Sequence, residues 1–315
     1  MTTLSSALNA TDVANMLHIG RNAVYELAKC GELPSYKMGR KLLFTLADVN
    51  AYLESKQQNA GKPAPSDPLA DTPLTPPALL SGNEPFLLAG EGAACAAAAS
   101  FAQQMGIPLE QKISCDFAAL TQLYEGAVAA AVVSLFDFRT NGFNTPFIQR
   151  LVPGTSVISF RLVTQQAGFI VAYGNPKRLS TWSSLFREST RIANRKRGTM
   201  ERILLDEKAI SLEYLPAYIT GYTTEAPSAY EAAALVDAGL ADACIGTAAT
   251  ARLFKNVQFV PLQTVATDLV VAKTEQTRPL IRALKTALIN PAGSQAFESA
   301  LPCDTANLGS VVFEC

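Results

Sequence analysis

The sequence predicts two globular units of different fold class, a small α unit at the N-terminus and a larger α/β unit behind it. Two short amphipathic helix patterns around a glycine turn lie within residues 1–56, and alternating strand and helix patterns fill residues 84–315. Residues 57–83 are rich in proline and lack periodicity, which is typical of a linker. A chain of 315 residues that is 49% hydrophobic has enough apolar surface for more than one core.

Composition limits the classes of function. The formal net charge is −1, and residues 1–58 hold six Lys/Arg against five Asp/Glu, so any affinity for nucleic acid must be local. The one histidine, His18, cannot build a multi-histidine metal site or a His-dependent catalytic triad. The six cysteines contain no C-x-x-C pair and predict neither a zinc cluster nor a disulfide framework. We therefore expect no metal and no cofactor.

The N-terminus lacks the basic and unbroken apolar segments of a signal peptide. No apolar run elsewhere reaches the length needed to span a membrane. We therefore expect a cytoplasmic protein without a membrane partner, in which the cysteines are free thiols.

The first helix is predicted over about Ala10 to Leu17. Asn9 and Asp12 have the spacing of an N-cap and its reciprocal partner, and an apolar stripe follows. The turn 18–20 contains a glycine and has the length that joins the two helices of a helix-turn-helix.

The second helix is predicted over 21–29, and the rest of the chain is organised around it. Val24, Leu27 and Ala28 share one apolar face. The opposite face carries side chains of the types that contact base edges and phosphates, namely Arg21, Asn22, Tyr25, Glu26 and Lys29. An ordinary solvated helix face would have the same composition, so the neighbouring segments decide between the two interpretations.

Two β-prone runs around Gly39 follow the second helix and predict a hairpin with Lys37, Arg40 and Lys41 near its tip. Such a wing can lay cations along a phosphate backbone. Thr45 and Asp48 then have the spacing that caps a last helix.

The stretch ATDVANMLHIGRNAVYELAKCGELPSYKMGRKLLFTLADVNAYL, about 45 residues, resembles the winged helix-turn-helix of the excisionase and MerR-like group. The resemblance implies that the partner is a double-stranded DNA operator. It also implies that Arg21, Asn22, Tyr25 and Lys29 face the major groove, while Lys37, Arg40 and Lys41 hold phosphates. Because one such module reads few base pairs, we expect a homodimer on a two-fold operator.

The larger unit begins with a buried-type strand at 86–89 and an alanine-rich helix that ends near Met105. Further strands are predicted in the runs AVAAAVVS, VISFRLV, GFIVAY, RIAN, ADACIG and VQFVPL, with helices at 117–124 and from Met200 and Ser228. The pattern predicts a doubly wound α/β architecture repeated in two halves. Such sheets bind ligands at the carboxyl ends of strands, beside helix N-termini.

That rule selects four strand-to-helix turns as pocket candidates, together with Arg195, the cation that precedes the third of these turns. An ordinary strand-to-helix turn would explain any one of them, but four on one architecture favour a site. The candidate ligand-binding residues are Glu91, Gly92, Ser134, Asp137, Arg195, Thr199, Glu201, Arg202, Gly246 and Thr247.

The runs ALTQLYEGAVAAAVVSLFDFRTNGFNTPFIQRLVPG, GFIVAYGNPKRLSTWSSL, NRKRGTMERILLDE and GYTTEAPSAYEAAALVDAGLADACIG also carry a resemblance, over about 230 residues. They resemble the periplasmic-binding-protein-like domain of molybdopterin-biosynthesis proteins and of molybdate- or tungstate-sensing regulators. The resemblance implies a small α winged helix-turn-helix domain joined to an α/β two-lobed periplasmic-binding-protein-like domain that closes on a small ligand.

The sequence departs from that family in the pocket loops. A second-lobe turn of Gly-Ser-Gly-Thr-Arg type is here the run 198–202, with Glu201, and a Ser-His-Asp loop is Glu91-Gly92-Ala93. Ser134 and Ala229 stand where the family has histidines. Carboxylates beside an oxyanion repel it by several kcal/mol at low dielectric unless they are protonated or paired with Arg195 or Arg202.

These substitutions favour an amine-bearing or zwitterionic effector, held by Glu91 or Glu201 with any anionic end on Arg202. The predicted function is therefore a one-component transcriptional regulator, with a molybdate- or tungstate-responsive regulator as the alternative. An enzyme on this fold is a lesser alternative, because Glu91, Glu201, Cys95 and Cys115 are reactive types but no nucleophile–base pair is recognisable. A phage-type architectural DNA protein would have no use for the larger unit.

Overall fold

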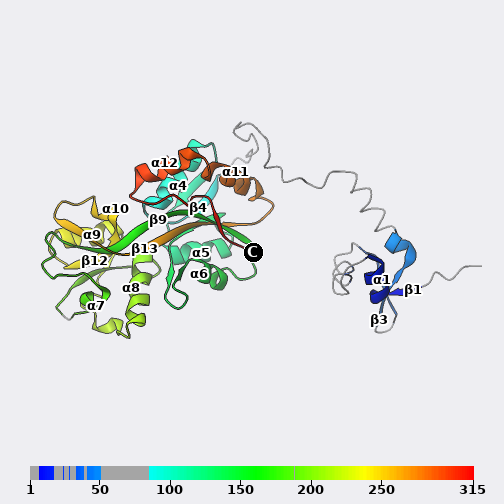
Figure 1. The fold of residues 1–315 in the computed structure, drawn as a ribbon, viewed down its shortest axis with the longest axis horizontal. Helices are drawn as coiled ribbons and strands as arrows, with labels where there is room; N and C mark the ends of the chain where they lie inside the picture. The colour runs from blue at the N-terminus through cyan, green and yellow to red at the C-terminus, as the bar shows by residue number, and fades with distance from the viewer. Residues whose placement is uncertain are drawn as a thin grey trace, which may run out of the picture. The chain divides into compact units, whose positions relative to one another are not determined.

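The computed structural model describes residues 7–17, 24, 28, 33–38, 41–50, 85–187 and 189–315. The chain divides into two compact units, residues 1–75 and 76–315 (Figure 1). The predicted linker 57–83 lies outside the described residues. Among the helices that are described, none is both long and apolar enough to cross a membrane.

In the N-terminal unit, helix α1 (Ala10–Leu17) has the predicted bounds. Asn9 Oδ1 accepts hydrogen bonds from the backbone N–H of Thr11 at 2.8 Å and of Asp12 at 3.1 Å. Asp12 Oδ2 accepts in return from Asn9 N at 3.0 Å. The predicted reciprocal cap is therefore confirmed, and it supplies partners for amide groups that the first helical turn cannot satisfy.

Strands β2 (Tyr36–Met38) and β3 (Lys41–Thr45) form the predicted antiparallel hairpin. A third strand, β1 (Ala7–Asn9), pairs with the other edge of β3 and was not predicted, because three residues are too few to show a period. Asp48 N donates to Thr45 Oγ1 at 3.1 Å, and residues 46–50 are helical, as the cap spacing predicts.

A small apolar core joins these elements. Val24 is fully buried and Ala28 packs at the edge of the core, which agrees with the apolar face predicted for the second helix. Both residues are helical, while the positions around them lie outside the described residues. The remaining buried members come from α1, β3, the helical residues 46–50 and the segment before β2, namely Ala10, Val13, Ala14, Leu33, Phe44 and Val49.

The larger unit is built on one nine-stranded mixed sheet, with the order β11-β10-β12-β9-β13-β6-β4-β5 and β14 paired to β9. The strands are β4 (Phe86–Ala89), β5 (Leu109–Lys112), β6 (Ala130–Val133), β9 (Val157–Ala172), β10 (Ile192–Arg195), β11 (Glu225–Ala226), β12 (Ala243–Thr247), β13 (Val257–Ala272) and β14 (Val311–Glu314). A separate hairpin joins β7 (Phe136–Asp137) to β8 (Gly142–Phe143).

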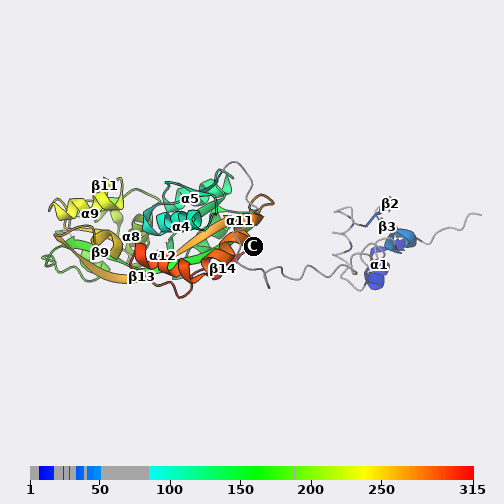
Figure 2. The same ribbon diagram turned by 90° about the horizontal axis from the view of Figure 1, so that it is seen from above.

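The prediction of separate short strands was wrong at β9 and β13, which are 16 residues each. The runs VISFRLV and GFIVAY belong to one strand, because Gln165 and Gln166 between them continue the ladder opposite Val265 and Thr264. The two long strands pair antiparallel along their lengths and run through both lobes (Figures 1 and 2). The halves therefore share one sheet instead of repeating two parallel ones.

Helices cover both faces of the sheet in each lobe. In lobe 1, α4 (Gly92–Gln104), α11 (Arg278–Leu288) and α12 (Pro291–Ala300) pack on one face, and α5 (Asp116–Tyr124) and α6 (Thr145–Leu151) pack on the other. In lobe 2, α7 (Trp182–Leu185) and α8 (Met200–Ser211) share one face with the 3-10 turn η1 (Pro216–Tyr218) nearby. Helices α9 (Ala229–Asp237) and α10 (Ala248–Ala251) cover the opposite face.

The ladder between the long strands bends at Gly168. The register shifts between Pro261 and Gln263, which leaves Leu262 as an extra residue opposite Gly168. A Cβ atom added to Gly168 would lie 2.0 Å from the carbonyl oxygen of Val260, so only glycine fits the local backbone.

Replacing Gly168 with alanine should therefore destabilise the larger unit by about 2–3 kcal/mol, because the new methyl group meets rigid backbone. Urea unfolding gives this difference. Gly246→Ala is the matched control in the adjacent strand, since its Cβ would meet the tip of Ile170 at 2.7 Å, and a side-chain tip can move. Equal losses in the two variants would contradict the argument.

Candidate ligand-binding cleft

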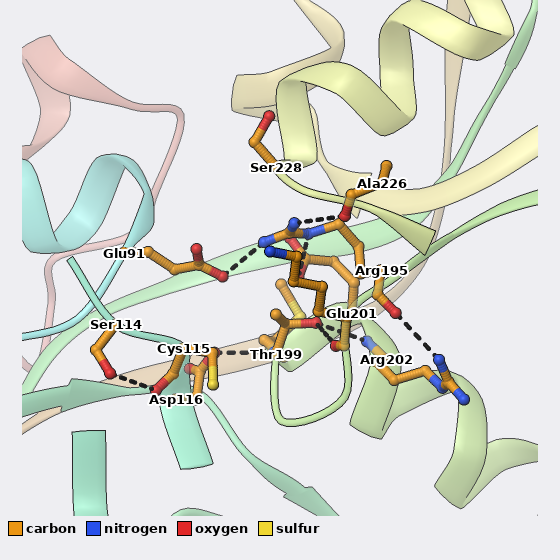
Figure 3. Close-up of polar contacts among 12 residues, drawn as sticks. Glu91, Ser114, Cys115, Asp116, Arg195, Thr199, Glu201, Arg202, Ala226 and Ser228 are labelled. Atoms are coloured by element: carbon orange, nitrogen blue, oxygen red, sulfur yellow. Dashed lines mark hydrogen bonds and ion pairs between the residues drawn. The ribbon is translucent and has the colours of Figure 1, made fainter. Parts of the chain in front are cut away.

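The candidate cleft lies where the two lobes meet beside the long strands. Lobe 2 contributes the end of β10, the turn after it and the first turn of α8, while lobe 1 contributes Glu91 and the start of α5 (Figure 3). These are the strand-to-helix turns at which an α/β fold exposes side chains and free amide groups.

Arg195, the last residue of β10, is the cation at the centre of the cleft, and its side chain is 2% exposed. Its Nη2 atom donates to Glu91 Oε1 at 2.6 Å, and Nη1 donates to the carbonyl oxygen of Ala226 at 3.1 Å. Its Nε atom is buried and has no hydrogen-bond acceptor among the described residues. Glu201 Oε2 lies 3.6 Å from that Nε, so one guanidinium faces carboxylates from both lobes.

Glu201 lies in the first turn of α8, where the N-terminal end of the helix dipole favours a negative charge. Its side chain is 11% exposed. Burial raises the pKa of the Glu201 carboxyl, the positive charge of Arg195 opposes that rise, and the nearby Glu91 charge adds to it.

Asp116 is the cleft residue that sequence reasoning missed. Its Oδ1 atom accepts from Ser134 N of the same lobe at 2.8 Å, and Oδ2 accepts from Met200 N at the start of α8 at 2.9 Å. Burial and the Glu201 charge together raise the pKa of Asp116 to about 7, although the two backbone N–H groups act in the opposite direction. The same rule that selected the other turns would have selected this one, because Asp116 opens the helix after β5.

The backbone also closes the lobes on each other. Phe117 N donates to the carbonyl oxygen of Gly198 across the cleft at 2.9 Å, and Cys115 Sγ lies 3.9 Å from the carbonyl oxygen of Arg197. A cavity of about 10 Å³ is lined by residues that include Arg195 and Glu201. That volume holds about one water molecule, and the residues that line it all belong to lobe 2.

Several of the predicted site residues meet here. Glu91 and Glu201 contact Arg195, Ser134 supplies its amide to Asp116, and Thr199 caps α8 by accepting from Arg202 N at 3.4 Å. Gly92 opens α4 with φ +83°, and a Cβ atom built there would meet open space.

Arg202 does not join this group, although it was expected to hold an anionic end of the ligand. Its guanidinium donates to both carboxylate oxygens of Asp206, at 3.1 and 3.2 Å, and to Glu225 Oε1 at 2.9 Å. It also stacks over the ring of Tyr222, 4.1 Å from the centroid, and points away from Glu91 in Figure 3. These partners saturate Arg202 within lobe 2.

The structure likewise places three other predicted residues in local roles. Asp137 accepts from Thr140 N and Oγ1 at 3.1 and 2.6 Å within the β7–β8 hairpin, and from Arg150 Nη1 at 3.4 Å. Burial would raise the pKa of Asp137, but these bonds and the Arg150 charge outweigh it and lower that pKa. Gly246 lies inside β12 and not in the turn after it, and Thr247 caps the short helix α10. Hydrophobicity alone did not show where β12 ends.

The predicted DNA-binding residues are mostly untested by the structure. The backbones of Lys37 and Lys41 lie in the wing strands β2 and β3. Arg21, Asn22, Tyr25, Lys29 and Arg40 lie outside the described residues.

The cleft has an acidic balance. Glu91 and Glu201 face the guanidinium of Arg195, and Asp116 lies near enough for the charges of these two carboxylates to raise its pKa. Three carboxyl groups and one guanidinium have an excess of two negative charges when all four are ionised, and this balance favours a cation over an anion. Within the described parts of the chain, no three His, Cys, Asp or Glu side chains form a group that could hold a metal ion.

Comparison with known sequences agrees with this architecture. The family described as the PBP superfamily domain matches residues 98–288. The chain belongs to the PBP superfamily. A second family, described as a helix-turn-helix domain, matches residues 7–57. This PBP-superfamily chain thus combines a DNA-binding domain with a ligand-binding domain, which is the organisation of a DNA-binding regulator.

Two relatives align with this chain, one over most of its length and one over about a third of it. The Bacillus subtilis protein YvgK is 30% identical over 289 residues, which cover 90% of each chain. A Clostridium pasteurianum protein from the region 5′ of a 2Fe-2S ferredoxin gene is 31% identical over 112 residues, 36% of this chain and 99% of its own.

Solved structures resemble the fold at low identity. A hydrogen-peroxide-bound mutant of OxyR from Corynebacterium glutamicum is 16% identical with a TM-score of 0.50, covering 93% of this chain and 88% of its own. A periplasmic protein described as metal-binding is 14% identical with a TM-score of 0.54, covering 71% of this chain and 95% of its own. At such identities the likeness extends to the fold alone.

The raised pKa of Asp116, about 7 against an ordinary 3.8, makes stability depend on pH. The folded state binds this proton more tightly than the unfolded state, so the stabilisation is complete below pH 3.8 and is lost as the pH rises through 7. The change amounts to at most roughly 4 kcal/mol. Urea unfolding of the wild type should show falling stability between about pH 4 and about pH 7, with a flatter profile in Asp116→Asn.

Asp137→Asn is the control for this experiment, because the pKa of Asp137 is lowered and its contribution has the opposite sign. That contribution is present at neutral pH and is lost as the pH falls through the lowered pKa. An identical slope in wild type and Asp116→Asn would contradict the assignment.

Proposed function

We propose that this protein is a one-component transcriptional regulator whose cleft senses a small amine-bearing metabolite. The observation that carries the proposal is the acidic balance of the cleft, where the Glu91 and Glu201 carboxylates face one guanidinium and Asp116 lies close to both of them. A cation entering between Glu91 and Glu201 would relieve their mutual repulsion and replace the hydration that burial removes.

The same balance weighs against molybdate, tungstate or another oxyanion as the effector. A dianion would add like charge to Glu91 and Glu201, and the positive charge of Arg195 is already shared between them. Arg202, which could have served an anionic end, is held by Asp206 and Glu225. We therefore favour a ligand whose recognition depends on its amine, with its body in the opened cleft.

The DNA-binding role of this regulator rests on the N-terminal unit. The helix-turn-helix match over residues 7–57, the two helix caps and the β2–β3 wing support a winged helix-turn-helix. A single module of this size reads few base pairs, which supports a homodimer on a two-fold operator. Contact with the genome makes the cytoplasm the compartment in which we expect it to act.

Arg21→Ala and Tyr25→Ala should each lose about 1–3 kcal/mol of discrimination between the operator and unrelated DNA, because they remove contacts to base edges. Lys41→Ala should instead weaken binding to every sequence and reduce the salt slope by about 1. Fluorescence anisotropy across a range of salt concentrations measures both effects. Equal losses of affinity for operator and unrelated DNA in all three variants would contradict the assignment of the second helix to base recognition and of the wing to the phosphate backbone.

Molybdate, tungstate and sulfate should leave the melting temperature of the wild type unchanged, whereas an amine-bearing metabolite from a compound library should raise it by mass action. Glu201→Gln should weaken that metabolite at least tenfold, and Glu110→Gln on the exposed end of β5 serves as the control. Recovery of the compound unchanged separates sensing from catalysis. Micromolar binding of molybdate to the wild type, measured by calorimetry, would instead favour the oxyanion-responsive regulator.

A further inference from the structure

We propose that the Asp116 carboxylate is a built-in anion that occupies the N-terminus of α8, closes the lobes without a ligand and excludes oxyanions from the cleft. This inference rests on the proposed function for its biological meaning, because it assigns the specificity and the closure of the same cleft. The predicted effects on cleft closure and on oxyanion binding depend only on the contacts of Asp116.

The first step concerns the free donors of α8. The opening N–H groups of a helix have no partner within the helix, and they are the groups that hold a bound anion. Here Met200 N donates to Asp116 at 2.9 Å, and Arg202 N donates to the Thr199 side chain at 3.4 Å. Side chains of the protein therefore satisfy two of the first three N–H donors of α8, those of Met200 and Arg202.

The second step concerns the two ends of the Asp116 contact. One carboxylate oxygen is held by Ser134 N in lobe 1 and the other by Met200 N in lobe 2, so the side chain bridges the lobes. The neighbouring Phe117 N donates to the carbonyl oxygen of Gly198 across the same junction. Opening the cleft must break both hydrogen bonds to lobe 2 together.

The third step concerns Arg195, the cation beside α8 at the lobe junction. Its side chain is 2% exposed, its Nη2 atom donates to Glu91 Oε1 at 2.6 Å, and its Nε atom forms no hydrogen bond among the described residues but lies 3.6 Å from Glu201 Oε2. Carboxylates of both lobes therefore already share this cation, and an added oxyanion would have to compete with them for it.

Asp116→Ser and Asp116→Asn test this role in the full chain. Removing the carboxylate should uncover Met200 N, so the variants should bind sulfate, the probe anion, at least tenfold more tightly than the wild type by calorimetry. Amide hydrogen exchange at the start of α8 should also accelerate at least tenfold, while exchange at α9 on the opposite face of lobe 2 stays unchanged. The asparagine variant keeps the size of the side chain if the serine variant folds poorly.

Asp137→Asn is the matched control, since it removes another buried carboxylate of lobe 1 that binds within its own hairpin. It should match the wild type in sulfate binding and in exchange at α8. Unchanged α8 exchange in both Asp116 variants, or sulfate binding by the wild type as tight as theirs, would overturn the proposal. Neither measurement involves DNA or an amine, so failure here is distinguishable from failure of the proposed function.

Discussion

The larger unit depends on the antiparallel pairing of β9 with β13. Each strand spans both lobes, so the two halves of one sheet cannot fold or move independently of the shared ladder. The register shifts between Pro261 and Gln263 and between Thr267 and Asp268 place irregularities in the middle of this ladder. Bulges bend a strand and increase its twist locally, so the position of one lobe against the other is decided at these points.

A polar network holds the lobe 1 end of that region. Asp268 is 1% exposed and pairs with Arg161 on the neighbouring strand, while Asn144 Nδ2 donates to its other oxygen at 2.7 Å. Asn144 Oδ1 in turn accepts from Leu135 N at 2.7 Å, beside the Ser134 amide that binds Asp116. The shared ladder and the cleft are thus connected by hydrogen bonds through the end of β6.

The cleft itself concentrates charge where the fold gains little stability from it. Burying ions is expensive, and well-packed apolar side chains of similar volume are often as stabilising as a buried ion pair. Glu91, Asp116, Arg195 and Glu201 nevertheless meet at the lobe junction. Perturbed titratable groups gathered at one junction are typical of a functional site. An effector can change DNA affinity through this cleft only if it binds one arrangement of the two lobes more tightly than the other.

Sequence patterns alone determined the local elements of this protein. Asn9 with Asp12 and Thr45 with Asp48 predicted two helix starts correctly, because a cap is made by residues three positions apart. The turn rule likewise selected Glu91, Ser134, Thr199 and Glu201 as cleft residues. Asp116 also follows a strand and opens a helix, but its bridging role depends on an amide of Met200 that is remote in the sequence.

The tertiary structure decided which predicted groups meet and how the sheet is shared. Nothing in the run 157–172 shows that it is one strand, because the pairing of Gln165 and Gln166 with β13 comes from contacts about 100 residues away. Arg195 and Arg202 look equivalent in the sequence, yet one enters the cleft and the other is held by Asp206, Glu225 and Tyr222. Local propensity acts over a few residues, whereas the direction of a long cationic side chain follows the carboxylates that the fold brings within its reach.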